Sequence, residues 1–357
     1  MVAIPNGPDD LTAAWFSDAI GDGATCTSVR VAPIGVGVGL VGQLHACDLE
    51  WSGPAAGERP HRVVAKLAAA GVESRFVAMV LNMYGREVGF YRELSPHTSL
   101  DHPICYYADH EPESHDTVLL LEDVSSRGAQ LDQIAGASLE AVEPALRAIA
   151  QLHAQWWEHE RFAASGWLLR LCDDPYPAAV QLAYGAGWPN VQEHFAEQMT
   201  PRVRAFGDAY SEQIPAMFAS LCDGPLTLSH ADWRLDNLFF TSDPARPVIA
   251  VDWQLIDRSV GPRDVAYLVT QSLELSSTAE FVKALDIYLD ELAASGVTVD
   301  RDWALLKYRQ ATRFGFVYPV VAGGSLTVED PRHMTLCGTL LRRCVAAIDA
   351  LDAYDLA

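Results

Sequence analysis

The pattern of apolar and polar positions divides the chain into two parts. In roughly the first 125 residues, β-branched or alternating apolar segments are separated by turns that contain glycine and proline, as strands usually are. We predict five strands in this part, within residues 27–35, 41–51, 61–69, 104–109 and 117–124.

Two helices are also predicted in this part. Residues 9–21 begin with Asp9 and Asp10, two candidate capping residues, and end at Gly21, a pattern that is typical of a short helix. A longer helix is predicted from about Val72 to Leu94, because apolar positions recur there at helical spacing. The residues at this spacing are Phe76, Val80, Met83, Glu87, Phe90 and Leu94.

After Ser125 the pattern becomes mainly helical. Residues 138–162 place their apolar positions on one helical face, and further helices are predicted near 190–220, 262–275, 277–295, 300–318 and 331–353. Strand patterns return only within 226–230, 237–241 and 247–253. We therefore predict two lobes, residues 1–124 and residues 125–357, with short strands inside the second, helical lobe.

Composition narrows the class of protein. The chain has 357 residues, of which 50% are hydrophobic, so it can bury a large core. Acidic residues outnumber basic ones, 47 to 25, and no basic stripe occurs, so we expect no nucleic-acid partner. The first residues lack a secretory signal pattern, and no apolar run approaches the ~18 residues of a membrane-spanning helix. Seven scattered cysteines without a CxxC pair are typical of reduced thiols, so we expect a cytoplasmic protein with no membrane partner.

A dense polar cluster lies between two apolar runs, in residues 227–240. Burying so many polar groups without partners would cost several kcal/mol each. The cluster lies in a loop between short strands, which is where catalytic groups are often held by rigid neighbours. Its members are His230, Asp232, Arg234, Asp236 and Asn237.

The spacing within and after this cluster indicates phosphoryl-transfer chemistry. Asn237 offers a neutral amide oxygen, and Asp252, at the end of an apolar strand, offers an anionic one. Together they form a partial, oxygen-only shell that suits Mg²⁺, which takes its other ligands from water and phosphates. Asp232 is then left to accept a proton or a hydroxyl hydrogen bond.

Residues that would bind nucleotide phosphates occur in the first lobe. Lys66 interrupts an apolar strand, and Glu87 lies on the long predicted helix, so the two side chains are candidates for an ion pair. The alternatives are a lysine that extends to solvent and an exposed helical glutamate.

A glycine-rich segment precedes that strand, at Gly35, Gly37, Gly39 and Gly42. A dinucleotide-binding GxGxxG motif requires a helix next, but a strand pattern follows here. Glycines inside a hairpin suit a phosphate cover, because backbone N–H groups can approach the anion. The alternative is a plain flexible turn.

The end of the fifth strand, Glu122 to Val124, is a candidate connection between the lobes. Backbone groups of such a connection would be free to meet the edge of an adenine ring.

The chain resembles a known family in the order of its features. These are the glycine hairpin, strand lysine, helix glutamate, "LEDV" connection, "LHAQWW" helix, HxDxxxxN loop and strand-end aspartate. The family is the aminoglycoside phosphotransferase-like family, with its ecdysteroid-kinase-like and choline-kinase-like relatives. The resemblance extends from about Ile34 to Leu268 and is most specific in "HADWRLDNLFF" and "VDWQLIDRSVGPRDVAYLV". It implies an α+β, two-lobed protein-kinase-like fold, with a small antiparallel sheet in the N-lobe and a larger, mostly helical C-lobe.

The resemblance also implies roles for individual residues. Asp232 would be the catalytic base, and His230 would shape its loop. Mg²⁺ would be held by Asn237 and Asp252. The remaining implied ATP ligands are the glycine hairpin, Lys66 paired with Glu87, and the Glu122–Val124 connection.

Other positions are interpreted as structural. Asp264 resembles a buried aspartate that braces the catalytic loop, and His153 is interpreted as a core histidine. Ala231 stands where glycine is common in the family. Arg234 is expected to pair with Asp236 or another loop carboxylate, although a phosphate or anionic substrate is an alternative. Two aromatic residues, Trp253 and Tyr267, are interpreted as packing.

The predicted function is an ATP- and Mg²⁺-dependent phosphotransferase that moves the γ-phosphate to a hydroxyl of a small molecule. Acidic and aromatic residues within 166–215 would suit a cationic acceptor, such as an amino sugar, an aminoglycoside or a choline-like amine, or would form a solvated face. The alternative functions are a regulatory pseudokinase and a metal-dependent hydrolase. The residues concerned are Asp173, Asp174, Tyr176, Tyr184, Trp188, Glu193 and Glu197.

Overall fold

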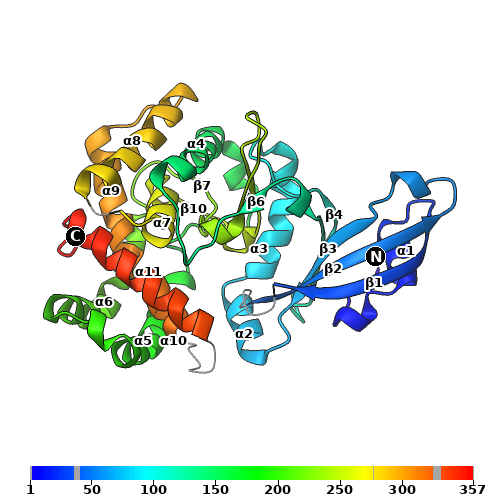
Figure 1. Ribbon diagram of the computed structural model, residues 1–357, viewed down its shortest axis with the longest axis horizontal. Coiled ribbons are helices and arrows are strands. Elements are labelled where there is room, and N and C mark those ends of the chain that lie inside the picture. Colours follow the sequence, from blue (N-terminus) through cyan, green and yellow to red (C-terminus); the bar gives the residue numbers. More distant parts are fainter. Residues whose placement is uncertain (1, 36–40, 276, 325–330, 357) are drawn as a thin grey trace. The chain divides into compact units, whose positions relative to one another are not determined.

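The computed structural model describes residues 2–35, 41–275, 277–324 and 331–356, and it divides into two compact units (Figure 1). The first unit comprises residues 1–97 and 102–127, and the second comprises residues 98–101 and 128–357. Each unit has its own sheet and helices. The predicted α+β class, with a small antiparallel sheet in one unit and a mostly helical second unit, is confirmed.

The first unit is built on a five-stranded antiparallel sheet with the order β1-β2-β3-β5-β4. All five strands form where the alternating pattern predicts them. They are β1 (Thr25–Ile34), β2 (Gly42–Ser52), β3 (Arg62–Ala68), β4 (Cys105–His110) and β5 (Thr117–Glu122).

The core of this unit lies on one face of the sheet, under helix α1 (Ala13–Ile20). Thr12 caps α1 by accepting a hydrogen bond from the backbone N–H of Trp15. Ala65 and Leu67 of β3 belong to this core. Because side chains alternate along a strand, Lys66 lies on the opposite face of the sheet.

The long helix predicted from Val72 to Leu94 is interrupted, so that prediction is wrong in detail. The chain forms α2 (Val72–Val80), α3 (Met83–Gly89) and a π-helical turn (Phe90–Leu94). Asn82 separates α2 from α3 with φ 48° and ψ 38°, a left-handed conformation that asparagine tolerates better than most residues. Gly85 leaves room for this break, because a Cβ there would lie 2.4 Å from Oδ1 of Asn82.

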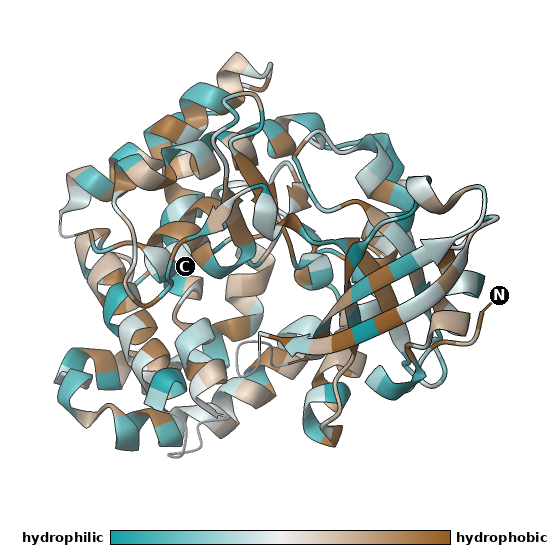
Figure 2. Ribbon diagram, turned by 45° about the vertical axis from the view of Figure 1, so that its right-hand side comes forward, coloured by the Kyte–Doolittle hydropathy of each residue, from teal (hydrophilic) through white to brown (hydrophobic). Residues whose placement is uncertain are grey.

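The second unit consists mainly of helices around two small sheets. The sheets pair β10 with β7, and β6 with β8 and β9. In Figure 2 the helices at the edge of this unit alternate between hydrophobic and hydrophilic stretches, as amphipathic helices do. Its helices are α4 (Leu139–Gln155), α5 (Tyr176–His194), α6 (Pro201–Ser220), α7 (Pro262–Ser272), α8 (Thr278–Ala294), α9 (Arg301–Phe314), α10 (Val317–Gly324) and α11 (Pro331–Ala350). Its strands are β6 (Ala129–Gln130), β7 (Thr227–Ser229), β8 (Leu238–Phe240), β9 (Val248–Ala250) and β10 (Asp257–Ser259).

Helix α7 is the central element of this unit, and all of its residues are buried. A helix that is buried all round must satisfy its polar side chains with protein partners. It carries several polar residues, including Asp264 and Tyr267, which makes it the natural support for a buried polar loop. Among the described residues, no helix combines the length and apolarity that crossing a membrane requires.

His45 on β2 generates a prediction about pH and stability. Its side chain is buried, and neither ring nitrogen has a hydrogen-bond partner among the described residues. Burial lowers the pKa of His45, so the unfolded chain binds a proton more readily than the folded chain below about pH 6.5. His45→Leu should therefore raise the free energy of unfolding by about 1 kcal/mol at pH 8. The gain should grow as the pH falls below about 6.5, because the wild type loses stability there.

Urea unfolding of both proteins at pH 8 and pH 5.5 measures this difference. The control is His61→Leu, which changes an exposed histidine just before β3. An equal gain for His45→Leu at the two pH values would contradict the assignment of His45 as a buried neutral imidazole.

Candidate active site

The polar cluster forms a buried loop that begins after β7 and ends at β8 in the second unit. A short 3-10 turn, Leu235–Asn237, closes the loop. His230, Asp232 and Asn237 are all buried. Each of them must therefore have hydrogen-bond partners, and the surrounding protein supplies these.

The first partner is Asp264, at the beginning of α7. Its Oδ2 accepts hydrogen bonds from the hydroxyl of Ser229 at 2.8 Å and from the backbone N–H of His230 at 2.9 Å. Its Oδ1 accepts from the backbone N–H of Ala231 at 2.9 Å. His153 contacts the same carboxylate, with Nε2 at 3.1 Å from Oδ2. Asp264 thus braces the loop, as the family resemblance implies.

The charge of Asp264 is maintained by these donors. Burial alone would raise the pKa of Asp264, but the hydrogen bond and charge of His153, together with the nearby Arg263, lower it to about 2. His153 is fully buried and also contacts the hydroxyl of Tyr288 at 3.0 Å, so it is a satisfied core histidine. Asp264 is therefore an ionised acceptor for the backbone of the loop.

Ala231 adopts a left-handed backbone conformation, with φ 68°. This conformation costs a residue with a Cβ roughly 1–2 kcal/mol, which explains why glycine suits the position. The hydrogen bond from Ala231 to Asp264 helps to hold this turn. This left-handed turn directs the next residue, Asp232, away from Asp264.

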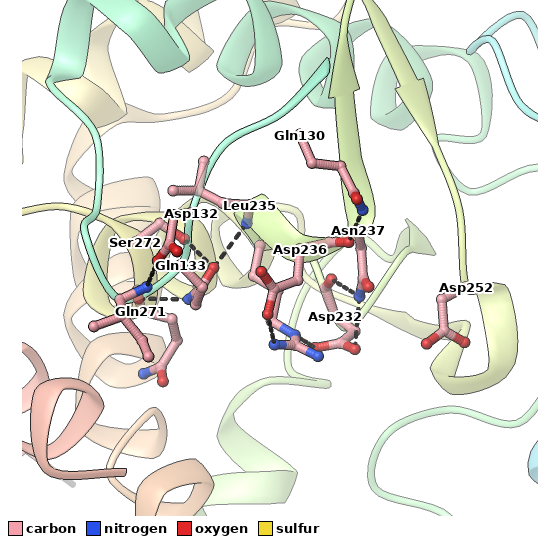
Figure 3. A network of polar contacts seen from close by, with 12 residues as sticks. Gln130, Asp132, Gln133, Asp232, Leu235, Asp236, Asn237, Asp252, Gln271 and Ser272 are labelled. Atoms are coloured by element: carbon pink, nitrogen blue, oxygen red, sulfur yellow. Dashed lines mark hydrogen bonds and ion pairs between the residues drawn. The ribbon is translucent and has the colours of Figure 1, made fainter. Parts of the chain in front are cut away.

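Asp232 lies at the centre of the loop, and its carboxylate has three donors. Oδ2 accepts from Nδ2 of Asn237 at 2.7 Å (Figure 3), and Oδ1 accepts from Nε of Arg234 at 3.0 Å. The hydroxyl of Tyr267 donates to Oδ1 at 2.6 Å. The prediction that Tyr267 serves only for packing is therefore wrong. Burial opposes ionisation, but Arg234 and the Tyr267 hydrogen bond lower the pKa of Asp232, so its carboxylate stays charged.

Arg234 forms the predicted ion pair with Asp236. The Nη1 of Arg234 lies 3.0 Å from Oδ2 of Asp236, and its Nε binds Asp232. One guanidinium group therefore holds two loop carboxylates. This arrangement places Arg234 inside the loop, as expected from the sequence.

His230 contributes through its ring and not through its charge. Nε2 lies 3.1 Å from the carbonyl oxygen of Val251, and Nδ1 accepts the backbone N–H of Asp232 at 3.4 Å. The ring packs on Trp253, with the centroids 4.6 Å apart. Burial lowers the pKa of His230, which keeps the imidazole neutral. His230 therefore ties the catalytic loop to the segment before Asp252.

Asn237 and Asp252 lie at neighbouring ends of the paired strands β8 and β9. Leu238 pairs with Ala250, and the backbone N–H of Val251 donates to the carbonyl oxygen of Asn237 at 3.0 Å. The Nδ2 of Asn237 donates to both the backbone oxygen and Oδ2 of Asp232. Its amide oxygen therefore faces away from Asp232, on the side of Asp252 (Figure 3).

These two residues fit a hard cation that brings further ligands of its own. Both offer oxygen, and Asp252 also adopts a left-handed conformation, with φ 66°, at the end of β9. The described residues contain no group of three or more His, Cys, Asp or Glu side chains arranged to hold a metal. A cation that depends on water and phosphate ligands, such as Mg²⁺, suits this set better than one that needs a full protein shell.

A second brace, absent from the sequence interpretation, holds the far side of the loop. The Oε1 of Gln133 accepts the backbone N–H of Leu235 at 3.0 Å, and its Nε2 donates to the carbonyl oxygen of Gln271 at 2.6 Å (Figure 3). Gln130 donates to the carbonyl oxygen of Asp236. No sequence signal points to these residues, because they lie about a hundred positions away from the loop and have no characteristic motif.

The first unit brings Lys66 and Glu87 together. The Nζ of Lys66 lies 2.7 Å from Oε2 of Glu87, and the two side chains are only 10% and 2% exposed. The structure thus favours the predicted ion pair over an extended, solvated lysine. Gly42 lies beside it, because a Cβ there would come within 3.4 Å of Cε of Lys66.

The remaining predicted nucleotide ligands have different positions. Gly35 has φ 63°, as a glycine turn allows, whereas Gly37 and Gly39 lie outside the described residues. Strand β2, and not a helix, follows at Gly42, unlike a dinucleotide-binding motif. The carboxylate of Glu122 accepts from Arg127 at 3.0 Å, and Val124 is buried in a 3-10 turn. Contact of these residues with a nucleotide stays a prediction.

The predicted acceptor-side aromatic residues are part of the core. Tyr176, Tyr184 and Trp188 of α5 are all buried. Tyr184 stacks on Tyr210 of α6 with the ring centroids 4.8 Å apart, and its hydroxyl donates to the carbonyl oxygen of Gly207. Tyr184 and Trp188 thus pack on α6, and contact of these three rings with an acceptor stays a prediction.

With this geometry established, the chain can be compared with known proteins. The model of the ecdysteroid kinase-like family matches residues 41–298, most of the chain. The chain therefore belongs to the ecdysteroid kinase-like family, and its predicted place among small-molecule kinases is confirmed. No curated protein matches the chain significantly.

Solved structures show the same fold at low sequence identity. The amicoumacin kinase hAmiN, in complex with AMP-PNP, Ca²⁺ and Ami, has a TM-score of 0.57 at 11% identity, over 90% of this chain and 88% of that one. The GDP and kanamycin complex of APH(2″)-IIia has a TM-score of 0.57 at 13% identity, over 93% and 97%. A macrolide 2′-phosphotransferase from Brachybacterium faecium, MphH, matches with a TM-score of 0.47 at 18% identity, over 88% and 92%. The first two likenesses confirm the predicted kinase-like fold.

The Lys66–Glu87 pair generates a stability prediction. Lys66→Met would leave the Glu87 carboxylate buried without its ammonium partner, so the free energy of unfolding should fall by about 3 kcal/mol. The double variant Lys66→Met/Glu87→Leu should recover most of this loss, because both charges are then absent.

Urea unfolding of the single and double variants measures the coupling. Lys283→Met, which changes an exposed lysine of α8, is the matched control. If Lys66→Met were no more destabilising than Lys283→Met, the buried ion pair would be refuted.

Proposed function

We propose that the protein is an ATP- and Mg²⁺-dependent phosphotransferase that moves the γ-phosphate to a hydroxyl group of a small molecule. The observation that carries this proposal is the buried, ionised Asp232, braced by Asp264 and joined by Asn237 to the end of the strand that leads to Asp252. Membership in the ecdysteroid kinase-like family supports it. So do the nucleotides named for two structures of the same fold.

Nucleotide binding requires positively charged groups close to the negatively charged phosphates. Asn237 and Asp252 would hold Mg²⁺, which supplies charge neutralisation for the phosphates. Lys66 would contact the α- and β-phosphates, and its salt bridge with Glu87 would fix the direction of the ammonium group. Phosphoryl transfer depends mainly on such positioning by the protein and on charge stabilisation.

Asp232 would orient the acceptor hydroxyl and take its proton. Its lowered pKa makes it a weak base, so it would accept the proton only as the bond to phosphorus forms and the hydroxyl becomes acidic. Tyr267, Arg234 and Asn237 fix the carboxylate before the acceptor arrives. The carboxylate would therefore be preorganised for the acceptor hydroxyl.

The acceptor is a small molecule with a hydroxyl group, and amino sugars, aminoglycosides and choline-like amines are the first candidates. Two exposed acidic residues, Glu193 in the last turn of α5 and Glu197 between α5 and α6, would favour a cationic acceptor. The buried aromatic residues of α5 give no such support. A screen of these acceptors, read by ATP consumption, identifies the class.

Two aspartate variants separate the proposed roles. Asp252→Asn removes a charge that holds Mg²⁺, so the affinity for ATP in the presence of Mg²⁺ should fall by roughly tenfold or more, and turnover should fall with it. Asp232→Asn should leave Mg²⁺-dependent ATP binding nearly unchanged, while turnover falls by roughly 10²–10⁴-fold. Calorimetric titration of ATP with and without Mg²⁺, together with ATP consumption, measures both effects.

Asp243→Asn is the matched control, because Asp243 is an exposed aspartate in the turn between β8 and β9. It should alter neither quantity. Loss of Mg²⁺-ATP binding in Asp232→Asn, with binding retained in Asp252→Asn, would show that the two roles are assigned the wrong way round.

A further inference from the structure

The donors around Asp232 distinguish its two carboxylate oxygens. An ionised carboxylate offers about four lone-pair positions, two on each oxygen. Oδ1 accepts from both Tyr267 and Arg234, which fill its two positions. Oδ2 accepts from Asn237, which fills one. Among the described residues, the remaining position is therefore on Oδ2.

Tyr267 is a rigid donor, unlike a surface tyrosine. It lies on the fully buried helix α7, and its side chain is 7% exposed. Its ring packs against that of Tyr318 at a centroid distance of 4.2 Å. Burial raises the pKa of its hydroxyl well above the ordinary value, so the phenol stays protonated and donates a hydrogen bond to Asp232.

One face of α7 holds both the backbone and the side chain of the catalytic loop. Asp264 and Tyr267 are three positions apart, so they lie on the same side of the helix. Asp264 fixes the backbone of His230 and Ala231, and Tyr267 fixes the carboxylate of Asp232 one residue later. The position of that carboxylate is therefore set by the same rigid helix that sets the loop.

We propose that Tyr267 is a positioning residue for phosphoryl transfer: with Arg234 it occupies Oδ1 of Asp232 and leaves Oδ2 as the oxygen that receives the acceptor hydroxyl. The role rests on the proposed function. The acceptor oxygen bonds to the γ-phosphorus, the bond from that phosphorus to the β–γ bridging oxygen breaks, and ADP leaves with the electron pair. The hydroxyl proton passes to Oδ2. The products are the phosphate ester, ADP and one proton, which Asp232 later returns to water.

Tyr267→Phe tests this role, because it removes the hydroxyl and keeps the ring. The assay measures ATP consumption with water as the acceptor, and calorimetry measures Mg²⁺-ATP binding. We expect kcat to fall by about tenfold or more, while KM for ATP and its Kd stay unchanged, because the bond acts on the acceptor side. Tyr318→Phe is the matched control, since it removes the hydroxyl of the ring packed against Tyr267, and it should keep the wild-type kcat.

Three outcomes are distinct. If the wild type consumes ATP and Tyr267→Phe has the same kcat, or if both tyrosine variants lower kcat equally, the positioning role of Tyr267 is overturned and the proposed function stands. If the wild type consumes no ATP, with water or with any acceptor in the screen, the proposed function fails and this role fails with it. A fall in kcat confined to Tyr267→Phe supports the proposal.

A double-mutant cycle gives a second measurement that does not depend on turnover. Tyr267→Phe should raise the equilibrium constant for unfolding about tenfold in the wild type and much less in an Asp232→Ala background, where no side-chain oxygen remains to accept its hydrogen bond. Equal effects in the two backgrounds would show that the hydroxyl does not act through Asp232. This result would overturn the proposal even if Tyr267→Phe lowered kcat.

Discussion

The buried carboxylate of Asp264 is the interaction on which the rest of the second unit depends. It collects donors from β7, from the backbone of the catalytic loop and from His153 of α4. A charge buried this deeply is stable only when such donors surround it. Burial would raise the pKa of Asp264, but the hydrogen bond and charge of His153, with Arg263 nearby, lower it to about 2. The strand, the loop and two helices are therefore fixed around one anion.

The dense polar loop follows from this support. Asp264 turns the backbone at Ala231 into a left-handed conformation, and that turn presents Asp232 to Tyr267, Arg234 and Asn237. His230 then connects the loop to the carbonyl group of Val251, next to Asp252. Each polar side chain has a partner, so the cluster is buried without the penalty that an unpartnered group would carry.

Local patterns made much of the fold and part of the site predictable from the sequence. The five strands of the first unit follow from alternation, and the ion pair of Lys66 with Glu87 follows from a charged residue in each of two apolar elements. The break at Asn82 in the long predicted helix could not be predicted from periodicity. The left-handed conformation of Asn82 needs the space that Gly85 leaves, and the apolar pattern carries no sign of this. Tyr267 and Gln133 were missed for a similar reason, since only the tertiary fold brings them to the loop.

Hydrogen exchange in Asp264→Asn tests the central claim, that this one carboxylate organises the catalytic loop. Asparagine lacks the charge and offers one acceptor oxygen in place of two, so the amides of His230 and Ala231 lose a charged partner. Residue-resolved exchange should show these two amides exchanging at least about tenfold faster than in the wild type, while amides of β3 in the first unit keep their protection. Unchanged protection at His230 and Ala231, in a folded Asp264→Asn protein, would contradict the account.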